Sequence, residues 1–406
     1  MRFPEKREFF LQGANFFEFS GDRGAFFTRR IGLSDGEVQR IDYGLKLTGQ
    51  SGDFDVGVLQ VRTAEFARPE DEDGNPPGED FTVFRTRRRF LSQSHMGVLY
   101  TRRAERETGR DAGETLGFDL RLATNRFRGS KTLNFQTYYL WTSNAEGTGD
   151  SGKYGATLSY PNDIYSIRIR ATQTEENYDP TVGFRFRTAI RDYGGNFFWN
   201  PRPDNSSLFR NFNFGTFTNF ITDTANRKLS HRVDFTLLGV NFQSGDNFRI
   251  NVTPHAERLD NDFGLPGNIE LAEGGEFDYT RFRISGGTAG RRMVSLFGNY
   301  SWGNYFSGTR RDISGNLTVR PRLGVRLNFN GQWNRIELPE GQVSTTVYRR
   351  EIGTQFSPGW QSRLRWIMKP GNDIFFVYTH KWINDPAGIF TNDRSAVSKI
   401  VFTRRF

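Results

Sequence analysis

The sequence predicts an all-β protein, and more narrowly a transmembrane antiparallel β-barrel of about 20 strands (roughly 18–22) with short periplasmic turns and long outer loops. Three observations predict this fold class. Apolar and polar residues alternate with a period of two along most of the chain. The alternating segments are long enough to cross a bilayer, and the connections between them alternate between short and long.

The alternation is clearest over residues 323–333, where Leu323, Val325, Leu327 and Phe329 are separated by glycine, arginine and asparagine. A period of two places successive side chains on opposite faces of a strand. The same pattern recurs over residues 41–50, 116–123, 133–141, 165–172 and 248–253. In the first of these segments, Ile41, Tyr43, Leu45 and Leu47 are expected on the lipid side.

Segment length and aromatic placement favour a membrane barrel over the alternative of a large soluble β-protein. Each segment has about ten residues, the length of a tilted membrane-spanning strand, whereas strands of globular sheets usually have five or six. Aromatic residues lie near segment ends, as in the girdles of membrane barrels. The predicted girdle consists of Trp141, Trp302, Trp333, Trp366 and Trp382.

The connections are short at residues 49–53, 160–163 and 320–322, and long at 68–80 and 103–114. We expect the short ones to be periplasmic and the long ones to be outer loops. One region does not fit this alternation. Residues 357–359 and 369–373 are both short and flank a single segment, although 383–393 is expected to be an outer loop, so counts from the two ends differ by one strand.

Residues 1–30 do not alternate, and the predicted division is 1–30 and then a barrel over 31–406. Three roles are open for the first part: a lead-in from a periplasmic domain, a first strand, or a plug folded into the lumen. A barrel this wide needs some obstruction. The loop at 258–278 is the other candidate for an inward fold.

The chain ends in an alternating strand pattern that stops on an aromatic residue. Such an ending is similar to the assembly signal read by the outer-membrane insertion machinery, which together with outer-membrane lipid is an expected partner. The signal residues are Ile400, Phe402 and Phe406. The expected location is the bacterial outer membrane. The opening residues contain no apolar signal-peptide core, so we expect the sequence to begin after the signal or to be part of a longer chain.

The net charge of +9 points to an anionic partner. With apolar faces toward lipid, the predicted lumen lining is Lys46, Arg121, Arg168, Arg170, Arg249, Arg326, Arg363, Arg365, Asp42, Asp119 and Asp234. Such a lining favours anions in a pore, or its arginines pair with carboxylates and brace the wall. The cations are spread over many strands rather than gathered in one patch, so no nucleic-acid partner is expected.

The sequence predicts no enzyme, no cofactor and no metal site. It has no cysteine, and none of its four histidines lies within four residues of another, which excludes a helical histidine pair for zinc. Ser94 and His95 are adjacent and would suggest a membrane hydrolase. Neighbouring strand residues point to opposite faces, however, so a direct base–nucleophile contact is not expected.

Four stretches together resemble a known family. They are EFFLQGANFFEF (8–19), FFTRRIG (26–32), YGLKLTG (43–49) and RLRWIMKPGNDIFFVYTHKW (363–382). The chain resembles, over nearly its whole length, the uncharacterised outer-membrane β-barrel that follows a carbohydrate-binding family 9-like domain in Bacteroidetes-type bacteria. It departs from the family in lacking the signal peptide and binding domain and in a shortened region before residue 363. The family has no established activity, so the resemblance implies no functional residues.

The sequence favours a polar, cation-lined passage for solutes in the outer membrane, either open or plugged and gated. The solutes would be anionic or, by analogy with the carbohydrate-binding partner domain, glycan-like. The first alternative is a non-conducting anchor or secretion scaffold for a missing N-terminal domain. The second is an outer-membrane hydrolase.

Overall fold

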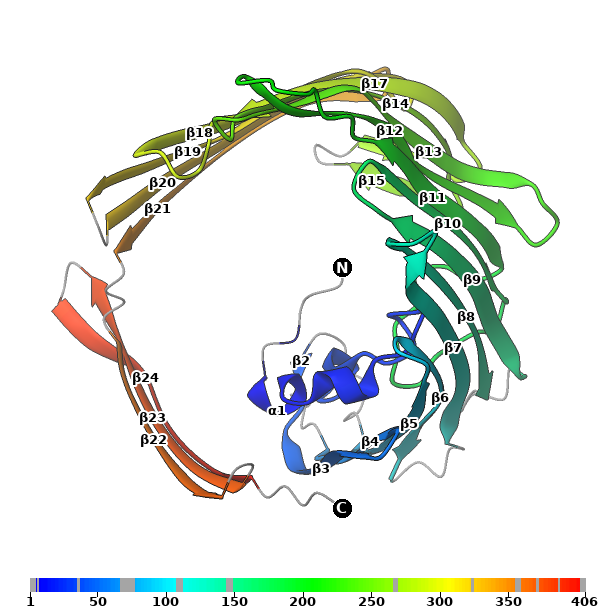
Figure 1. Ribbon diagram of the computed structural model, residues 1–406, viewed down its shortest axis with the longest axis vertical. Coiled ribbons are helices and arrows are strands. Elements are labelled where there is room, and N and C mark those ends of the chain that lie inside the picture. The colour runs from blue at the N-terminus through cyan, green and yellow to red at the C-terminus, as the bar shows by residue number, and fades with distance from the viewer. Residues whose placement is uncertain are drawn as a thin grey trace.

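The computed structural model describes the chain apart from residues 1–4, 6, 35–36, 66–76, 107–111, 144–148, 266–268, 323–324, 355–358, 370–371, 386–387 and 402–406. Side chains are further left undescribed at 34, 37, 322, 325–326, 342–343 and 345–401. The protein is all-β, as predicted, and is dominated by one large antiparallel sheet that curves around a hollow (Figure 1). No helix in the described part of the chain is long and apolar enough to span a membrane.

The large sheet pairs its strands in chain order from β3 to β21, every pair antiparallel. Its first strands are β3 (Ile41–Ser51), β4 (Phe54–Thr63), β5 (Glu79–Phe90), β6 (Ser94–Glu105), β7 (Gly113–Phe127), β8 (Lys131–Ser143), β9 (Ser151–Pro161), β10 (Tyr165–Thr174) and β11 (Ile190–Trp199). It continues with β12 (Phe209–Asp223), β13 (Lys228–Phe242), β14 (Asn247–Arg258), β17 (Glu276–Gly287), β18 (Val294–Tyr305), β19 (Gly308–Arg322), β20 (Val325–Leu338) and β21 (Gly341–Thr354).

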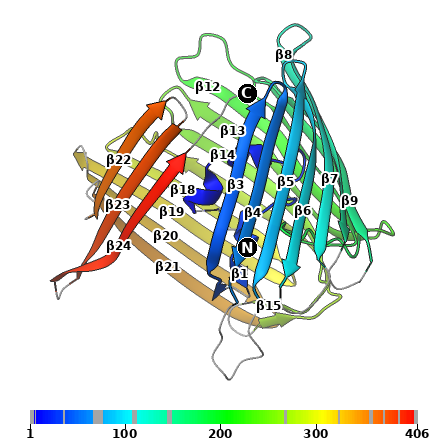
Figure 2. The same ribbon diagram turned by 90° about the horizontal axis from the view of Figure 1, so that it is seen from below.

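Three smaller sheets and three short helices complete the fold. A separate sheet of β22 (Gly359–Lys369), β23 (Asn372–Asp385) and β24 (Gly388–Val401) stands in the gap between β21 and β3 (Figures 1 and 2). The remaining elements are the hairpins β1 (Leu33–Ser34) with β2 (Glu37–Val38) and β15 (Phe263–Leu265) with β16 (Ile269–Leu271), and the helices α1 (Glu8–Leu11), η1 (Ala14–Phe17) and η2 (Thr28–Arg30).

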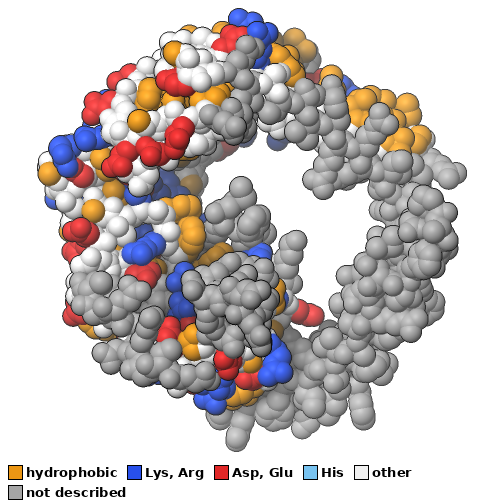
Figure 3. Space-filling view, turned by 180° about the vertical axis from the view of Figure 1, so that it is seen from behind, with side chains coloured by type: hydrophobic (Ala, Val, Ile, Leu, Met, Phe, Trp, Pro, Cys, Tyr) orange, Lys and Arg blue, Asp and Glu red, His pale blue; other side chains and the backbone are white. Residues whose placement is uncertain are grey.

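The alternation in the sequence becomes two distinct faces of the large sheet. Residues opposite each other in an antiparallel pair share a face, so rows of side chains run across the strands. On the convex face, Val58, Phe84, Tyr100, Leu116 and Trp141 form one such row across β4–β8. The concave face carries the arginines, asparagines and carboxylates over most of its width. The hollow on that side is visible in Figure 3.

The predicted alternation of short and long connections holds only for the first part of the chain. Residues 64–78 and 175–189 are long connections at the end of the sheet where β3 begins. Further along, β12 and β13 are joined by four residues and β18 and β19 by two, at that same end. In the second half, tight hairpins occur at both ends of the sheet beside the long connection 259–275, so loop length no longer distinguishes the two ends consistently.

The conflict in the strand count lies where the large sheet stops. It ends at β21, and the separate sheet begins at β22. The expected outer loop at 383–393 is wrong, because β23 runs to Asp385 and β24 begins at Gly388. Most of that stretch is strand.

The expected face assignment is wrong at the start of β3. The pairing with β4 shifts by one residue between Ile41 and Tyr43, which is the signature of a bulge. Ile41 consequently packs against the buried apolar cluster on the concave side instead of facing outward. Asp42 does not line the concave face as predicted but pairs with Arg40 near the exposed end of the strand, Nη2 to Oδ1 3.0 Å.

The N-terminal segment lies on the concave face of β3–β9 (Figures 1 and 2). Its described residues form short helices and loops and no strand of the large sheet. The loop at 258–278 forms the small hairpin β15–β16, whose Ile269 and Leu271 pack with Ile336 and Leu338 from the end of β20. Both inward candidates therefore make apolar contacts with the sheet.

Candidate functional site

The concave face is divided into a covered region and an uncovered one, and the division defines the candidate site. We call residues 5–34 the N-terminal plug segment. Its Phe10, Phe17 and Phe19 are buried against Leu59, Val61, Phe81, Val83 and Leu99 of β4–β6. Burying an aromatic or large aliphatic side chain stabilises by about 1.5–3 kcal/mol, so this cluster is a genuine core rather than a loose contact.

A second loop completes the cover. Residues 175–189 between β10 and β11 bring Tyr178 and Val182 into the same cluster, both fully buried. The two segments are joined through their backbones: the Phe27 amide donates to the Val182 carbonyl at 2.8 Å and the Phe184 amide to the Gly24 carbonyl at 2.8 Å. Burial raises the pKa of Tyr178 well above its ordinary value, so this phenol stays neutral.

The sheet is shaped to receive the plug segment. Gly57 in β4 lies under Phe17, and a Cβ placed there would come within 2.9 Å of the Phe17 ring. The absence of a side chain at that point is what allows the ring to rest on the strand. The glycine at position 57 of β4 therefore fits the position of the Phe17 ring from the plug segment.

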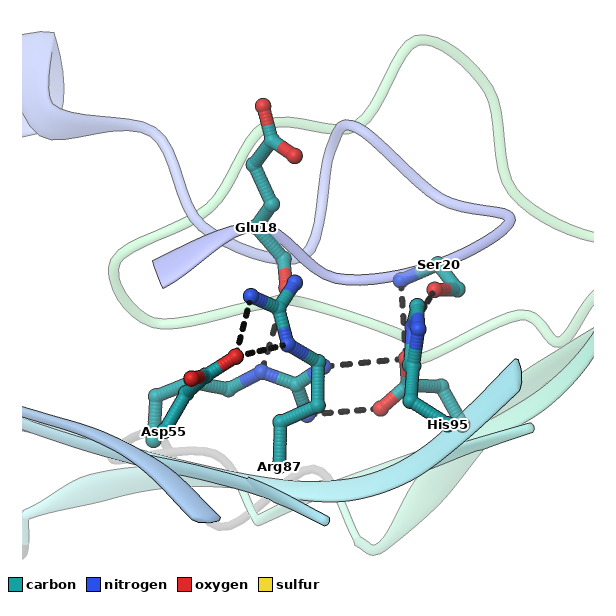
Figure 4. Close-up of polar contacts among 7 residues, drawn as sticks. Glu18, Ser20, Asp55, Arg87 and His95 are labelled. Atoms are coloured by element: carbon teal, nitrogen blue, oxygen red, sulfur yellow. Dashed lines mark hydrogen bonds and ion pairs between the residues drawn. The ribbon is translucent and has the colours of Figure 1, made fainter. Parts of the chain in front are cut away.

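Under the plug segment lies a fully buried ion pair. Arg85 of β5 and Asp119 of β7 are both 0% exposed, and the guanidinium meets the carboxylate through two hydrogen bonds of 2.6 and 2.9 Å. The plug segment supplies the remaining partners: the Glu18 carbonyl accepts from Arg85 Nε at 3.1 Å, and the Ser20 amide donates to Asp119 Oδ2 at 3.0 Å (Figure 4). A buried pair needs such extra hydrogen bonds to offset its desolvation.

Three further arginines and one further aspartate lie around this pair. Arg87 lies beside Asp55 at 2.8 Å (Figure 4), and Arg89 is 3.6 Å from the same carboxyl group. Arg121 is opposite His95 in the register and is half-buried. The floor beneath the plug segment is thus a network of cations and carboxylates that is buried at Arg85 and Asp119 and reaches solvent at Arg89, whose side chain is 44% exposed.

Ser20, His95 and Asp119 lie together but do not have the geometry of a catalytic triad. His95 Nε2 is 2.7 Å from Ser20 Oγ, and the same nitrogen is 3.8 Å from Asp119 Oδ2. In a triad the serine and the carboxylate contact different ring nitrogens. Ser94 does not contact His95 either, since its hydroxyl accepts from the Ala123 amide at 3.1 Å. The contacts of Ser20 with His95 and Asp119 tie the plug segment to the sheet.

The start of the plug segment is held by one acidic residue. Glu5 Oε2 accepts from Arg7 Nη2 at 2.7 Å and from Thr28 Oγ1 at 2.8 Å, while Arg7 also donates to the Thr28 and Ile31 carbonyls. Burial acts to raise the pKa of Glu5, but the hydrogen bonds from Arg7 and Thr28 outweigh it and lower the pKa to about 2. Lys46 of β3 adds a contact from the sheet to the carbonyls of Phe9 and Gln12.

The uncovered region extends over the concave side of β10–β19. Its charges are paired between strands but stay partly exposed: Arg170 with Asp192 of the adjacent strand at 2.7 Å, and Arg283 with Asp234 of the next-but-one strand at 3.0 Å. Arg168 is exposed on this face, and no ion pair to it is found among the described residues. This region keeps the polar lining that the sequence predicts.

A pocket of about 580 Å³ opens in the uncovered region, on β10–β14 and β17. Charged residues in its lining are Arg232, Asp234, Arg249 and Arg283. Aromatic rings and amides complete the lining with Phe198, Phe217, Asn200, Asn213 and Asn251. Within the described residues, no group of three or more histidine or acidic side chains is arranged to hold a metal ion.

The predicted lumen residues therefore fall into different environments. Arg168, Arg170, Arg249 and Asp234 lie in the uncovered region, with Arg249 and Asp234 in the pocket. Lys46, Arg121 and Asp119 lie beneath or beside the plug segment and are not a free lining. Asp42 belongs to neither place, as described above. The side chains of Arg326, Arg363 and Arg365 lie outside the described residues.

The predicted girdle residues in the described part of the chain are on the convex face. Trp141 lies opposite Leu116, Trp333 lies opposite Ile313, and Trp302 stacks on Phe282 with ring centres 5.7 Å apart. The side chains of Trp366 and Trp382, and the terminal residues Ile400, Phe402 and Phe406, lie outside the described side chains.

The sequence pattern missed the buried pair and the covering of β4–β6. Its signal was present: in these strands apolar residues occupy both faces, as with Val58 outward and Leu59 and Val61 inward. A strand that is apolar on both faces is covered on both. Arg85, Arg232 and Arg283 follow the alternation of their strands, but which carboxylate each meets depends on register.

Comparison with known proteins gives no assignment. No protein-family model matches the chain. No curated protein matches it either.

Proposed function

We propose that the chain is a transmembrane β-barrel of the bacterial outer membrane, closed by β22–β24 between β21 and β3. Among the described residues the large sheet has seventeen strands and the separate sheet three, which would make twenty if the separate sheet closes the barrel. Each is long enough to cross a bilayer with tilt. Closure would leave no exposed sheet edge, and an exposed edge is a site of aggregation in an open sheet of this length.

The composition of the convex face supports the proposed membrane location. Large apolar side chains are exposed there, among them Leu45, Leu47 and Ile169 at 61–67%. Convex charges gather at strand ends: Arg62 pairs with Asp80 at one end, and Arg88 lies over Phe54 at the other. An apolar belt between charged rims is what a bilayer demands, because charges cost most at its midplane.

The proposed activity is passage of anionic solutes through the uncovered region, with the plug segment narrowing the lumen. The observation that carries this is the pocket on β10–β17, where three arginines face one aspartate in an otherwise uncovered concave face. A cation-rich constriction favours anions. The proposal that glycan-like solutes also pass rests only on the family resemblance.

Single-channel recording of the refolded chain in a planar bilayer tests this function. We expect discrete steps and a reversal potential of anion-selective sign in a salt gradient. Arg168→Glu with Arg170→Glu should shift the reversal potential toward cations. Arg128→Glu, in the turn after β7, is the matched control and should leave the potential unchanged. Cation selectivity of the unaltered chain would contradict the proposed anion-selective lining, although the existence of a pore would still be supported.

A non-conducting anchor for a further N-terminal domain is the second candidate. It is favoured by the firmness of the plug segment, whose buried cluster and ion pair resemble permanent packing rather than a movable gate. The anchor would be supported over the passage if the chain inserts stably but carries no current. The Phe17→Ala variant, which loosens the plug segment, should then also carry no current.

A further inference from the structure

The pocket on β10–β17 has a floor defined by strand register. One concave row runs Ser166, Phe198, Gly215, Thr236, Asn251 and Arg283 across six strands. The neighbouring row contains Asn213, Gly239 and Arg249. Gly215 and Gly239 carry no side chain, so the floor is lowered between the longer residues around it.

Two phenylalanines form an apolar wall on a face that is otherwise polar. Phe198 lies across Gly215, where an added Cβ would come within 2.4 Å of the ring. Phe217, one row away and opposite Asp234, is 48% exposed although it faces the concave side. An aromatic ring exposed in an aqueous lumen costs hydration free energy that a flat apolar partner would recover.

The opposite wall supplies positive charge. Asp234 is occupied by Arg283 at 3.0 Å, by Arg232 at 3.4 Å and by the Asn251 amide at 2.7 Å. Arg249 is exposed in the same pocket, and no carboxylate among the described residues pairs with it. Asn251 is buried, and its Oδ1 lacks a hydrogen-bond partner within the part of the chain that the structure describes. The pocket thus holds one free guanidinium and an unpaired acceptor in its wall.

We propose that this pocket binds an aromatic monocarboxylate, with the carboxylate on Arg249 and the ring on Phe198 and Phe217; the inference rests on the proposed passage of anionic solutes and names their class. A guanidinium binds a carboxylate through two parallel hydrogen bonds. One aromatic wall fits a planar ring better than a small inorganic anion. Asp234 opposes a second negative charge and so favours monoanions over dianions.

Binding is measured directly, without depending on current. The probe is 4-fluorobenzoate, followed by fluorine NMR with the refolded full chain in detergent micelles. We expect saturable binding that benzoate displaces and that acetate and benzylammonium do not. Cyclohexanecarboxylate, which keeps the charge and apolar bulk but is not flat, should compete more weakly.

Variants locate the site. Arg249→Gln should weaken binding about tenfold or more, the loss expected for a charge-assisted hydrogen bond. Phe217→Leu should weaken it by about 2- to 10-fold, the value of one aromatic contact. Arg128→Gln removes an exposed cation in the turn after β7, away from the pocket, and it should leave the dissociation constant unchanged.

The results separate this inference from the proposed function. Equal binding to the Arg249→Gln and unaltered chains, or equal displacement by acetate, would overturn the aromatic carboxylate site even if the channel is anion-selective. If binding is saturable and depends on Arg249 but the chain carries no current, the binding site is supported and the proposed passage of anions is contradicted.

Discussion

The covered and uncovered regions of the concave face use the same residue types to opposite effect. In the covered region, Arg85 and Asp119 are 0% exposed and are completed by the backbone of the plug segment. In the uncovered region, Arg170 and Asp192 keep side-chain exposures of 36% and 25%. Both are arginine–aspartate pairs between next-but-one or adjacent strands. The difference shows that an arginine–aspartate pair on the concave face becomes buried or stays solvent-exposed depending on whether another segment of the chain covers it.

The largest expected difference comes from removing one charge of each pair. Asp119→Asn leaves Arg85 buried without a counter-charge, which should cost about 3–5 kcal/mol of stability. The matched change Asp192→Asn should cost about 1 kcal/mol or less, because that pair is partly solvated. The free energy of unfolding is measured by urea titration in lipid vesicles, with protease sensitivity of residues 5–34 as a local readout.

A second variant separates lost charge from lost packing. Arg85→Met combined with Asp119→Leu replaces the pair by apolar side chains of similar size and should recover most of the stability lost in Asp119→Asn. Equal destabilisation by Asp119→Asn and Asp192→Asn would contradict the distinction between the two regions.

The next largest effect compares the two faces of the sheet. Phe118 is 50% exposed on the convex face of β7, in the row of Val56, Val98 and Tyr139. Phe118→Arg should cost about 2–4 kcal/mol in a bilayer if this row lies near the midplane. Asn196→Arg on the concave face of β11 should cost about 1 kcal/mol or less. The two variants are compared by the same urea titration, and equal small costs would indicate a water-facing convex surface.

The smallest effect concerns the hold of the plug segment at low pH. The pKa of Glu5 is lowered to about 2 in the folded chain from an ordinary 4.5. Its stabilising contribution is therefore fully present above about pH 4.5 and is lost as the pH falls through about 2. We expect the plug segment to loosen over this window.

A spin label reports that loosening. The chain contains no cysteine, so Leu11→Cys gives a single labelling site on an exposed position of α1. Label mobility should rise between pH 4.5 and 2, and Glu5→Gln should be mobile already at neutral pH. Glu8→Gln, in the same helix, serves as the control. An unchanged label across this window would show that Glu5 does not hold the segment.

The sequence by itself determined the strand content and, for most strands, which residues share a face. Alternation in β7 placed Asp119 and Arg121 opposite Leu120 and Leu122, and the structure agrees, because side-chain direction in a strand follows from position alone. It failed at Asp42, where a bulge changes the phase, and in the second half of the chain, where tight hairpins occur at both ends of the sheet and loop length no longer indicates the side.

The tertiary structure decided what each concave residue does. The same alternation that predicts a lumen lining puts Asp119 under a plug segment and Asp234 in an open pocket. Partners of Arg85 are 34 and 67 residues away along the chain, and no local pattern encodes such distances. Face is a local property of the strand, whereas burial and pairing depend on which distant segment folds over it.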